Sequence, residues 1–185
     1  MTDGSERRQM YRGLDGKEYP VGEIAHGRPP PPDLDLPVRG VVERGHGVAG
    51  GGGAHAPHPQ GSLARQYPIF LERGLDLGRC YPGTLNVSIR PLAFRVHDPR
   101  WVFNDVLWTP KQPAETFLFA RCVVQHGSGY VKGFVYQPDP ATKTVHFDDP
   151  SQIQVAAPFV PEVANGSAVH LRLASSEVEL VRPEG

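Results

Sequence analysis

Short stretches in which apolar and polar residues alternate dominate the chain after about residue 36. Residues 84–89 alternate with a period of two, and residues 115–125 are rich in β-branched and aromatic side chains. Such short segments, with turn residues between them, are typical of β-strands. We therefore predict strands over 36–43, 84–89, 91–96, 115–125, 130–137, 153–157, 169–174 and 178–181.

Turn residues in this region predict which strands pair. His126-Gly127-Ser128-Gly129 separates two long strand segments and predicts a hairpin between 115–125 and 130–137. Ser175-Ser176-Glu177 separates the last two segments. By the same reasoning we expect 169–174 to pair with 178–181.

Residues 63–73 instead carry large apolar side chains at helical spacing. Ser62 stands where an N-cap belongs, and Gly74 stands where a C-cap glycine belongs. Pro68 must lie in the first turn of this helix or kink it, because proline lacks the N–H that an interior helical position needs. One short helix among many short strands predicts a mainly β fold, either a small barrel or a sandwich.

The N-terminal region has a different pattern. Residues 1–36 hold few large apolar side chains and show no period of 2 or 3.6, and their proline run at 29–32 favours an extended chain. We predict a disordered N-terminal tail over 1–36 and a single domain over 37–185. Residues 45–59 are rich in glycine, histidine and proline and predict a long loop.

Composition limits the possible partners. The chain has 185 residues, of which 19 are basic and 20 acidic, so a net charge of −1 gives no field that would attract nucleic acid or an anionic membrane. No apolar run approaches the roughly 20 residues of a membrane span, and no apolar stretch follows the N-terminus as in a signal peptide. The two cysteines are far apart in sequence, and we expect free thiols in a cytoplasmic protein.

Two weak signals for ligand chemistry lie in the glycine-rich segment. His55 and His58, with His46 nearby, suggest a metal site, although zinc needs three or four ligands and a solvated loop explains the spacing better. Consecutive glycines leave backbone N–H groups free to bind an anion. The Gly-Lys-Ser/Thr ending of a Walker loop is absent from the sequence, so a linker remains the simpler interpretation.

A more specific signal is the segment from Pro82 to Val87. Side chains two positions apart in a strand share one face, so Thr84 and Asn86 present a hydroxyl and an amide oxygen together. Two neutral oxygen ligands suit a hard cation such as Mg²⁺, which retains waters and binds phosphate oxygens.

The order of motifs along residues 37–174 resembles the CTP-dependent riboflavin kinases of archaea, a family of small cradle-loop β-barrels. The most specific match is Tyr81-Pro82-Gly83-Thr84-Leu85-Asn86, which is similar to the Gly-Thr-Leu-Asn segment of that family. The other matches, in order, are Gly40-Val41-Val42 before Gly45-His46-Gly47, Phe70 to Leu75, Gly133 to Pro138, Thr144-Val145-His146, Gln154 to Pro158, and Asn165 to Val169.

The resemblance implies a cradle-loop-like barrel that transfers a phosphate from CTP to riboflavin and gives FMN, as a monomer or small homo-oligomer. It implies Mg²⁺ as the cofactor, with Thr84 and Asn86 as metal ligands. It places the remaining contacts in two groups: Gly45, His46, Gly47, Phe159 and Val160 at the nucleotide, and Thr144 and Gln154 at the flavin. Such phosphoryl transfer needs positioning and charge neutralisation more than a covalent residue, and no catalytic residue is assigned.

Departures from the family pattern keep two alternatives open. Gln154 stands where the family has a glutamate, and Val160 and Pro161-Glu162 stand where it has Lys and Arg. The loop after Gly47 is also longer. A barrel that binds a flavin or nucleotide without transferring phosphate, and a different enzyme that uses His55 or His58, therefore remain alternatives.

Overall fold

The computed structural model describes residues 9–21, 27–43, 61–143, 148–160 and 163–184, and within them the protein is mainly β with one helix. That helix is too short and too polar to cross a membrane. The elements are β1 (Met10–Arg12), β2 (Glu18–Pro20), β3 (Leu36–Glu43), α1 (Ser62–Glu72), β4 (Leu85–Ser88), β5 (Ala93–Val96), β6 (Trp101–Val106), β7 (Glu115–His126), β8 (Gly129–Pro138), β9 (Gln152–Ala156), β10 (Ala168–Leu173) and β11 (Val178–Val181). Every predicted strand is confirmed, with ends that agree within two residues.

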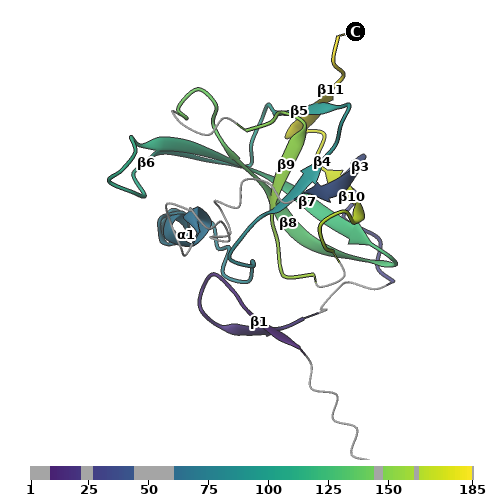
Figure 1. Ribbon diagram of the computed structural model, residues 1–185, viewed down its shortest axis with the longest axis horizontal. Helices are drawn as coiled ribbons and strands as arrows, with labels where there is room; N and C mark the ends of the chain where they lie inside the picture. The colour runs from purple at the N-terminus through teal and green to yellow at the C-terminus, as the bar shows by residue number, and fades with distance from the viewer. Residues whose placement is uncertain (1–8, 22–26, 44–60, 144–147, 161–162, 185) are drawn as a thin grey trace, which may run out of the picture.

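Six strands form a closed ring. The main sheet has the order β10-β3-β4-β9-β8-β7-β6, and an additional pairing of β10 with β7 closes its first six strands on themselves. All neighbours in this sheet are antiparallel. Figure 1 shows the β5–β11 ribbon and the β1–β2 hairpin at opposite ends of the molecule, with the ring between them.

The interior of the ring is apolar because alternate residues of every ring strand point into it. Val42, Val87, Val135, Ile153 and Leu171 are at most 7% exposed and belong to one buried cluster to which all six ring strands contribute. At about 25 cal/mol for each Å² of apolar surface buried, this cluster is a major source of stability. The side chains between these positions face outward, and those on β4 and β9 form the site described below.

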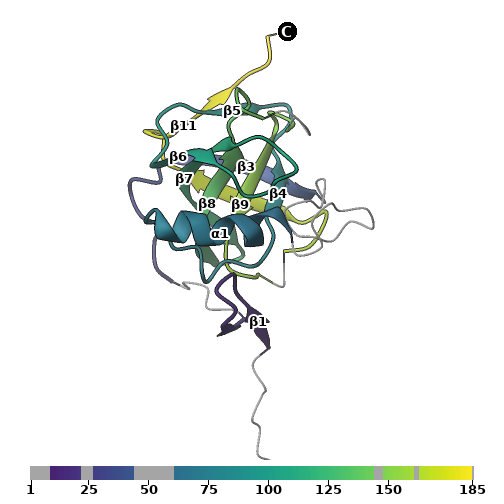
Figure 2. The ribbon, with the colours of Figure 1, turned by 90° about the vertical axis from the view of Figure 1, so that its left-hand side faces the viewer.

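A second core lies outside the ring, between α1 and strands β6 to β8 (Figure 2). The fully buried ring of Phe70 on α1 lies 5.2 Å from Phe103, 5.4 Å from Phe117 and 5.0 Å from Phe119. The last two rings meet it edge-on, an arrangement that aromatic quadrupoles favour. Because α1 covers this outer face, β7 is apolar on both of its sides.

The ends of α1 match the prediction at one terminus only. Gly74 has a φ of 100° and its N–H reaches the carbonyl of Leu71, as expected for a glycine that ends a helix. Ser62 is the first helical residue rather than the N-cap; Gly61 takes that position without a side-chain hydrogen bond. Pro68 is the seventh residue of α1, beyond the first turn, and is exposed.

The predicted pairing of the last two strands is wrong. β10 pairs with β3 and β7, while β11 pairs with β5 in a separate ribbon. The connection between β10 and β11 is hydrogen-bonded to β7: the carboxylate of Glu177 accepts hydrogen bonds from the backbone N–H and the Nε of Arg121. Closure of the ring takes up both edges of β10, so a local hairpin has no edge to use.

Three further strands were absent from the sequence prediction. β6 adds a seventh strand beside β7, and its register shifts between Phe103 and Val106 around Asp105, which has a φ of 52°. Within the predicted tail, β1 and β2 form a hairpin whose Tyr11 is 8% exposed. Three-residue strands are too short to show a period, so packing against the rest of the chain, rather than local pattern, accounts for them.

Candidate functional site

The site lies on the outer face of β4 and β9. Thr84 directly precedes β4, and Asn86 is the second residue of that strand. The register of the β4–β9 pair sets Asn86 opposite Gln154. Side chains of directly opposed residues share a face and lie close together, so the two strands bring three polar side chains into contact.

The three side chains present oxygen atoms to one another. The hydroxyl of Thr84 donates a hydrogen bond to Oδ1 of Asn86 at 2.9 Å and lies 3.5 Å from Oε1 of Gln154. Asn86 is only 8% exposed. The prediction that Thr84 and Asn86 share one face is confirmed, and the structure adds Gln154, which the resemblance placed at the flavin.

This donor set fits a hard divalent cation. Hydroxyl and amide oxygens are ligands that Mg²⁺ accepts when phosphate oxygens and waters complete its shell. Among the described residues, no group of three or more His, Cys, Asp or Glu side chains gathers as a zinc site would require. The neutral oxygens of Thr84 and Asn86, with that of Gln154 beside them, are therefore the candidate cation ligands at this site.

A carboxylate cluster borders these oxygens. Glu43, the last residue of β3, is opposite Asn86 and accepts a hydrogen bond from Nε2 of Gln152 at 3.2 Å. Arg90 lies 3.8 Å from Glu43 and also pairs with Asp149. The positive charge nearest this side of the site is thus already balanced by two carboxylates.

A small pocket continues from Gln154 along the outer face of β8 and β9. It has a volume of about 70 Å³, and its lining includes Tyr136, Asp148, Gln152 and Gln154. Asp148 accepts a hydrogen bond from Nζ of Lys143 at 2.7 Å. Lys143 and Asp148 are both largely buried, so this ion pair fixes one wall of the pocket.

Tyr136 forms the boundary between the pocket and the core beneath α1. Its hydroxyl donates a hydrogen bond to Oε1 of Gln66 on α1 at 2.9 Å. Burial raises the pKa of Tyr136, so the phenol remains protonated at all ordinary pH values. The pocket is therefore walled on this side by a neutral tyrosine whose hydroxyl proton is already donated to Gln66.

Phe159 and Val160, which the resemblance placed at the nucleotide, lie beside the start of β4. The backbone N–H of Tyr81 donates to the carbonyl of Ala157 at 2.9 Å, and the rings of Tyr81 and Phe159 are 5.2 Å apart. Val160 is buried in the interior of the ring. Of these two residues, Phe159 thus lies against Tyr81, three positions before Thr84, whereas Val160 belongs to the core of the ring.

Four predicted site residues lie outside the described residues: Gly45, His46, Gly47 and Thr144. The same holds for His55 and His58 of the alternative enzyme.

The sequence prediction missed the part of the site that depends on strand register. Glu43 and Gln152 join Asn86 only because β3, β4 and β9 are neighbours, and nothing in the local pattern of any one strand shows this. The alternation of β9, with Gln152 and Gln154 between buried Ile153 and Val155, was a usable signal. Two glutamines on the outer face of a short strand indicate a polar surface.

No protein-family model and no curated protein sequence matches this chain. The site is therefore characterised by its own geometry: three polar oxygens on adjacent strands, a small pocket beside them, and an aromatic pair at the start of β4.

Proposed function

We propose that this protein is a riboflavin-kinase-like phosphotransferase on a cradle-loop-like barrel, which moves a phosphate from CTP or another nucleotide to riboflavin and gives FMN. The observation that carries the proposal is the cluster of Thr84, Asn86 and Gln154, in which the Thr84 hydroxyl lies 2.9 Å and 3.5 Å from the two amide oxygens. The order of motifs along the chain and the ring of six strands support it.

In this proposal Thr84 and Asn86 hold Mg²⁺ at the phosphates of the nucleotide. When bound, the ion neutralises charge that develops during phosphoryl transfer. Asn86, fixed on β4 between β3 and β9, keeps its oxygen in place without reorganisation, which is what positioning catalysis needs. Gly45, His46 and Gly47 follow two residues after Glu43 and would contact the phosphates from that side.

The flavin would lie at the pocket beside Gln154. A volume of about 70 Å³ holds only an edge of a three-ring system, since pockets that enclose a whole ligand of this size measure roughly 300 Å³ or more. An amide both donates and accepts, so Gln154 suits the imide edge of a flavin, which does the same. Thr144 would add a contact beyond Lys143.

A second candidate is a barrel that binds a flavin or nucleotide without transferring phosphate. The cations that border the pocket, Lys143 and Arg90, are paired with Asp148 and Asp149. A triphosphate needs uncompensated positive charge, and within the described residues around the pocket these pairs leave little. This candidate predicts a ligand-dependent rise in melting temperature with no product.

The test is Mg²⁺-dependent formation of FMN by the purified full chain, with riboflavin and either CTP or ATP. Thr84→Val removes the hydroxyl with little change in shape, and we expect it to lower the rate about 100-fold, as the loss of one preorganised electrostatic contact does. Thr116→Val is the matched control, since Thr116 also donates from a strand to an asparagine, Asn104, at 3.3 Å but contributes nothing to the site. Absence of FMN with both nucleotides would refute the kinase and leave the binding barrel, which the melting temperature then tests.

A further inference from the structure

The β1–β2 hairpin docks on the segment that leads into the candidate site. The hydroxyl of Tyr11 donates to the carbonyl of Arg79 at 2.7 Å. The backbone N–H groups of Leu14 and Asp15 donate to the carbonyls of Cys80 and Gly78 at 3.0 and 3.2 Å. Three consecutive carbonyls, at positions 78 to 80, are thus held by the hairpin immediately before Tyr81 and four positions before Thr84.

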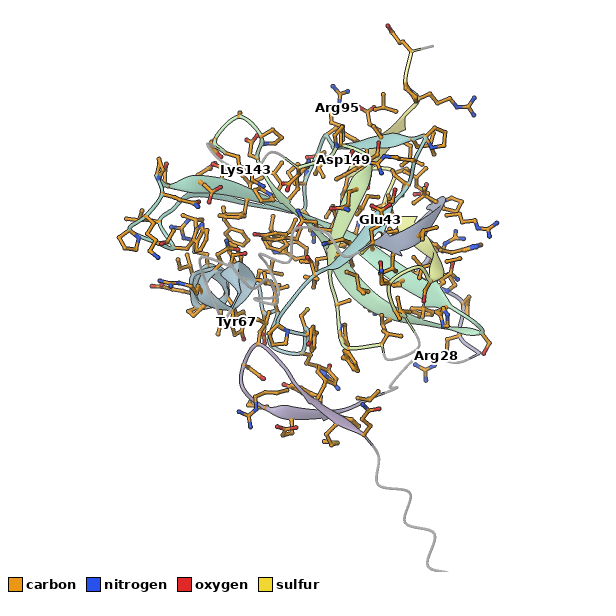
Figure 3. The ribbon with its side chains drawn as sticks, viewed as in Figure 1. Arg28, Glu43, Tyr67, Arg95, Lys143 and Asp149 are labelled. Carbon is orange, nitrogen blue, oxygen red and sulfur yellow. The ribbon has the colours of Figure 1, made fainter. Side chains whose placement is uncertain are left out.

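This docking depends on close backbone contact at two glycines. A Cβ at Gly13 would lie 2.2 Å from the carbonyl oxygen of Gly78, a distance that real contacts do not reach. A Cβ at Gly78 would lie 2.9 Å from the hydroxyl of Tyr67, on the side of α1 nearer the hairpin (Figure 3). The hairpin, the 78–80 segment and α1 therefore interlock, and a single methyl group at Gly13 would push them apart.

The hairpin also supports an aromatic surface. The ring of Tyr11 lies 6.1 Å from that of Phe159, which in turn lies 5.2 Å from that of Tyr81. Tyr11 is 8% exposed and Tyr81 is 44% exposed. Tyr11 is thus the buried support, and Tyr81 with the half-buried Phe159 is the surface that faces solvent.

We propose that the hairpin is a working part of the ligand site: it fixes Tyr81 and Phe159 as a wall on which the planar base of a nucleotide stacks. The proposal rests on the proposed function for the position of the phosphates, at Thr84 and Asn86. Stacking on aromatic side chains needs only a π-face, so the wall accepts any base and adds affinity rather than selectivity. This assigns a role to residues 9–21, for which the sequence predicted no role.

The wall is tested with nucleosides, because cytidine and adenosine carry the base without phosphate and need no metal. We expect both to bind the full chain in an NMR titration, with shifts in the signals of Tyr81 and Phe159. Tyr81→Leu removes an exposed ring and should weaken both nucleosides about tenfold, within the range for loss of one stacked base. Gly13→Ala should also weaken the binding of both nucleosides, although it changes neither Tyr81 nor Phe159.

Gly16→Asn is the matched control for the hairpin. Gly16 lies in the same turn, has a φ of 78°, which asparagine tolerates, and has nothing within 4 Å of an added Cβ. We expect nucleoside binding to be unchanged. If Gly13→Ala fails to fold, Tyr81→Leu and Tyr11→Leu still decide the question: Tyr11→Leu removes the support of Phe159 without substituting either wall residue, and it should weaken the binding of both nucleosides.

A second pair of ligands distinguishes the contribution of the base to binding from that of the phosphates. CTP with Mg²⁺ should lose affinity in Tyr81→Leu, whereas inorganic tripolyphosphate with Mg²⁺ should not, because it has no base. Nucleosides that fail to bind, or that bind equally well to Tyr81→Leu, would overturn the wall even if FMN is formed. Nucleoside binding that depends on Tyr81, without any FMN, would overturn the kinase and leave the wall standing.

Discussion

Two outer faces of the same ring have opposite characters. On β7 and β8 the outward side chains include Phe117, Phe119 and Tyr136, which pack in one cluster with Phe70 of α1. On β4 and β9 the outward side chains are polar, and Asn86 meets Gln154 there. Inward and outward residues alternate in the same way on both pairs of strands. The two faces differ because α1 packs against the outward residues of β7 and β8, and no described helix packs against those of β4 and β9.

The difference shows where a site can exist on such a fold. A face covered by a helix must be apolar and closely packed, which leaves no room for a ligand. A face on which no described helix packs can carry hydroxyl and amide side chains that hydrogen-bond to one another, as Thr84 and Asn86 do. The hydrogen bond from Tyr136 to Gln66 marks the border between the two faces, and the following predictions test how sharp that border is.

The largest expected effect is on the covered face. Phe70→Ala removes a ring that contacts three others and should lower the free energy of unfolding by about 3–5 kcal/mol, measured by urea denaturation. Leu71→Ala, at a neighbouring position that is 46% exposed, is the control and should cost less than about 1 kcal/mol. Equal losses in the two variants would show that α1 does not pack as a cover.

The second largest loss of stability is expected at Tyr136, on the border between the two faces. Tyr136→Phe leaves the buried oxygen of Gln66, a residue that is 1% exposed, without this donor and should cost about 1–3 kcal/mol. The double variant Tyr136→Phe with Gln66→Met removes both partners and should recover part of that loss. A double variant less stable than Tyr136→Phe alone would mean that Gln66 contributes through other contacts.

Alkaline pH should lower the free energy of unfolding through two buried thiols and two buried phenols. Burial raises the pKa of Cys80 from 9.0 to about 12 and the pKa of Tyr67 from 10.0 to about 12; it also raises the pKa values of Cys122 and Tyr136. The unfolded chain therefore loses these protons first, so stability is complete below about pH 9 and declines between about 9 and 12.

The cysteine part of this decline is measurable separately. At pH 10 each thiol whose pKa is raised by burial should cost about 1.4 kcal/mol, so the urea midpoint of the native chain should fall between pH 8 and 10. Cys122→Ala should show a shallower decline than the native chain over the same range. An identical pH dependence in the variant would contradict the assignment to this thiol.

The smallest effect on stability is expected on the uncovered face. Thr84→Val should lower the free energy of unfolding by about 1 kcal/mol, the low end of the range for a buried acceptor that loses one donor. The cost stays low because Thr84 is itself only partly buried, so water can replace its hydroxyl at Oδ1 of Asn86. The same variant is expected to abolish most activity under the proposed function. A Thr84→Val chain as unstable as Phe70→Ala would place Thr84 among the structural residues rather than at a site.

The sequence predicted the elements of both faces better than their arrangement. Alternation located β4, β9 and the β7–β8 hairpin, and it placed Thr84 and Asn86 on one face. It did not bring Gln154 to them, because a register between strands some 70 residues apart is set by closure of the ring and not by local pattern. The same closure explains the incorrect pairing of β10 with β11.

The residues of the N-terminal hairpin show a different limit. The structural roles of Tyr11 and Gly13 depend on their contacts with Arg79 and Gly78, which follow more than 60 positions later. A buried tyrosine and a glycine without space for a Cβ look, in the sequence, like any residues of a polar, proline-containing tail. Long-range packing of this kind leaves no periodic signal.

Closure of the ring also has a consequence for self-association. A sheet closed on itself offers no free edge to another chain, so the six ring strands are protected from edge-to-edge pairing. Among the described residues, β6 pairs in the main sheet with β7 alone, so its other edge is open to pairing, and Val102 and Leu107 are exposed there. The shifted register and the charged Asp105, in a left-handed conformation, interrupt that edge. An irregular position in β6 thus makes the open edge of the main sheet, within the described residues, less suited to regular pairing with another chain.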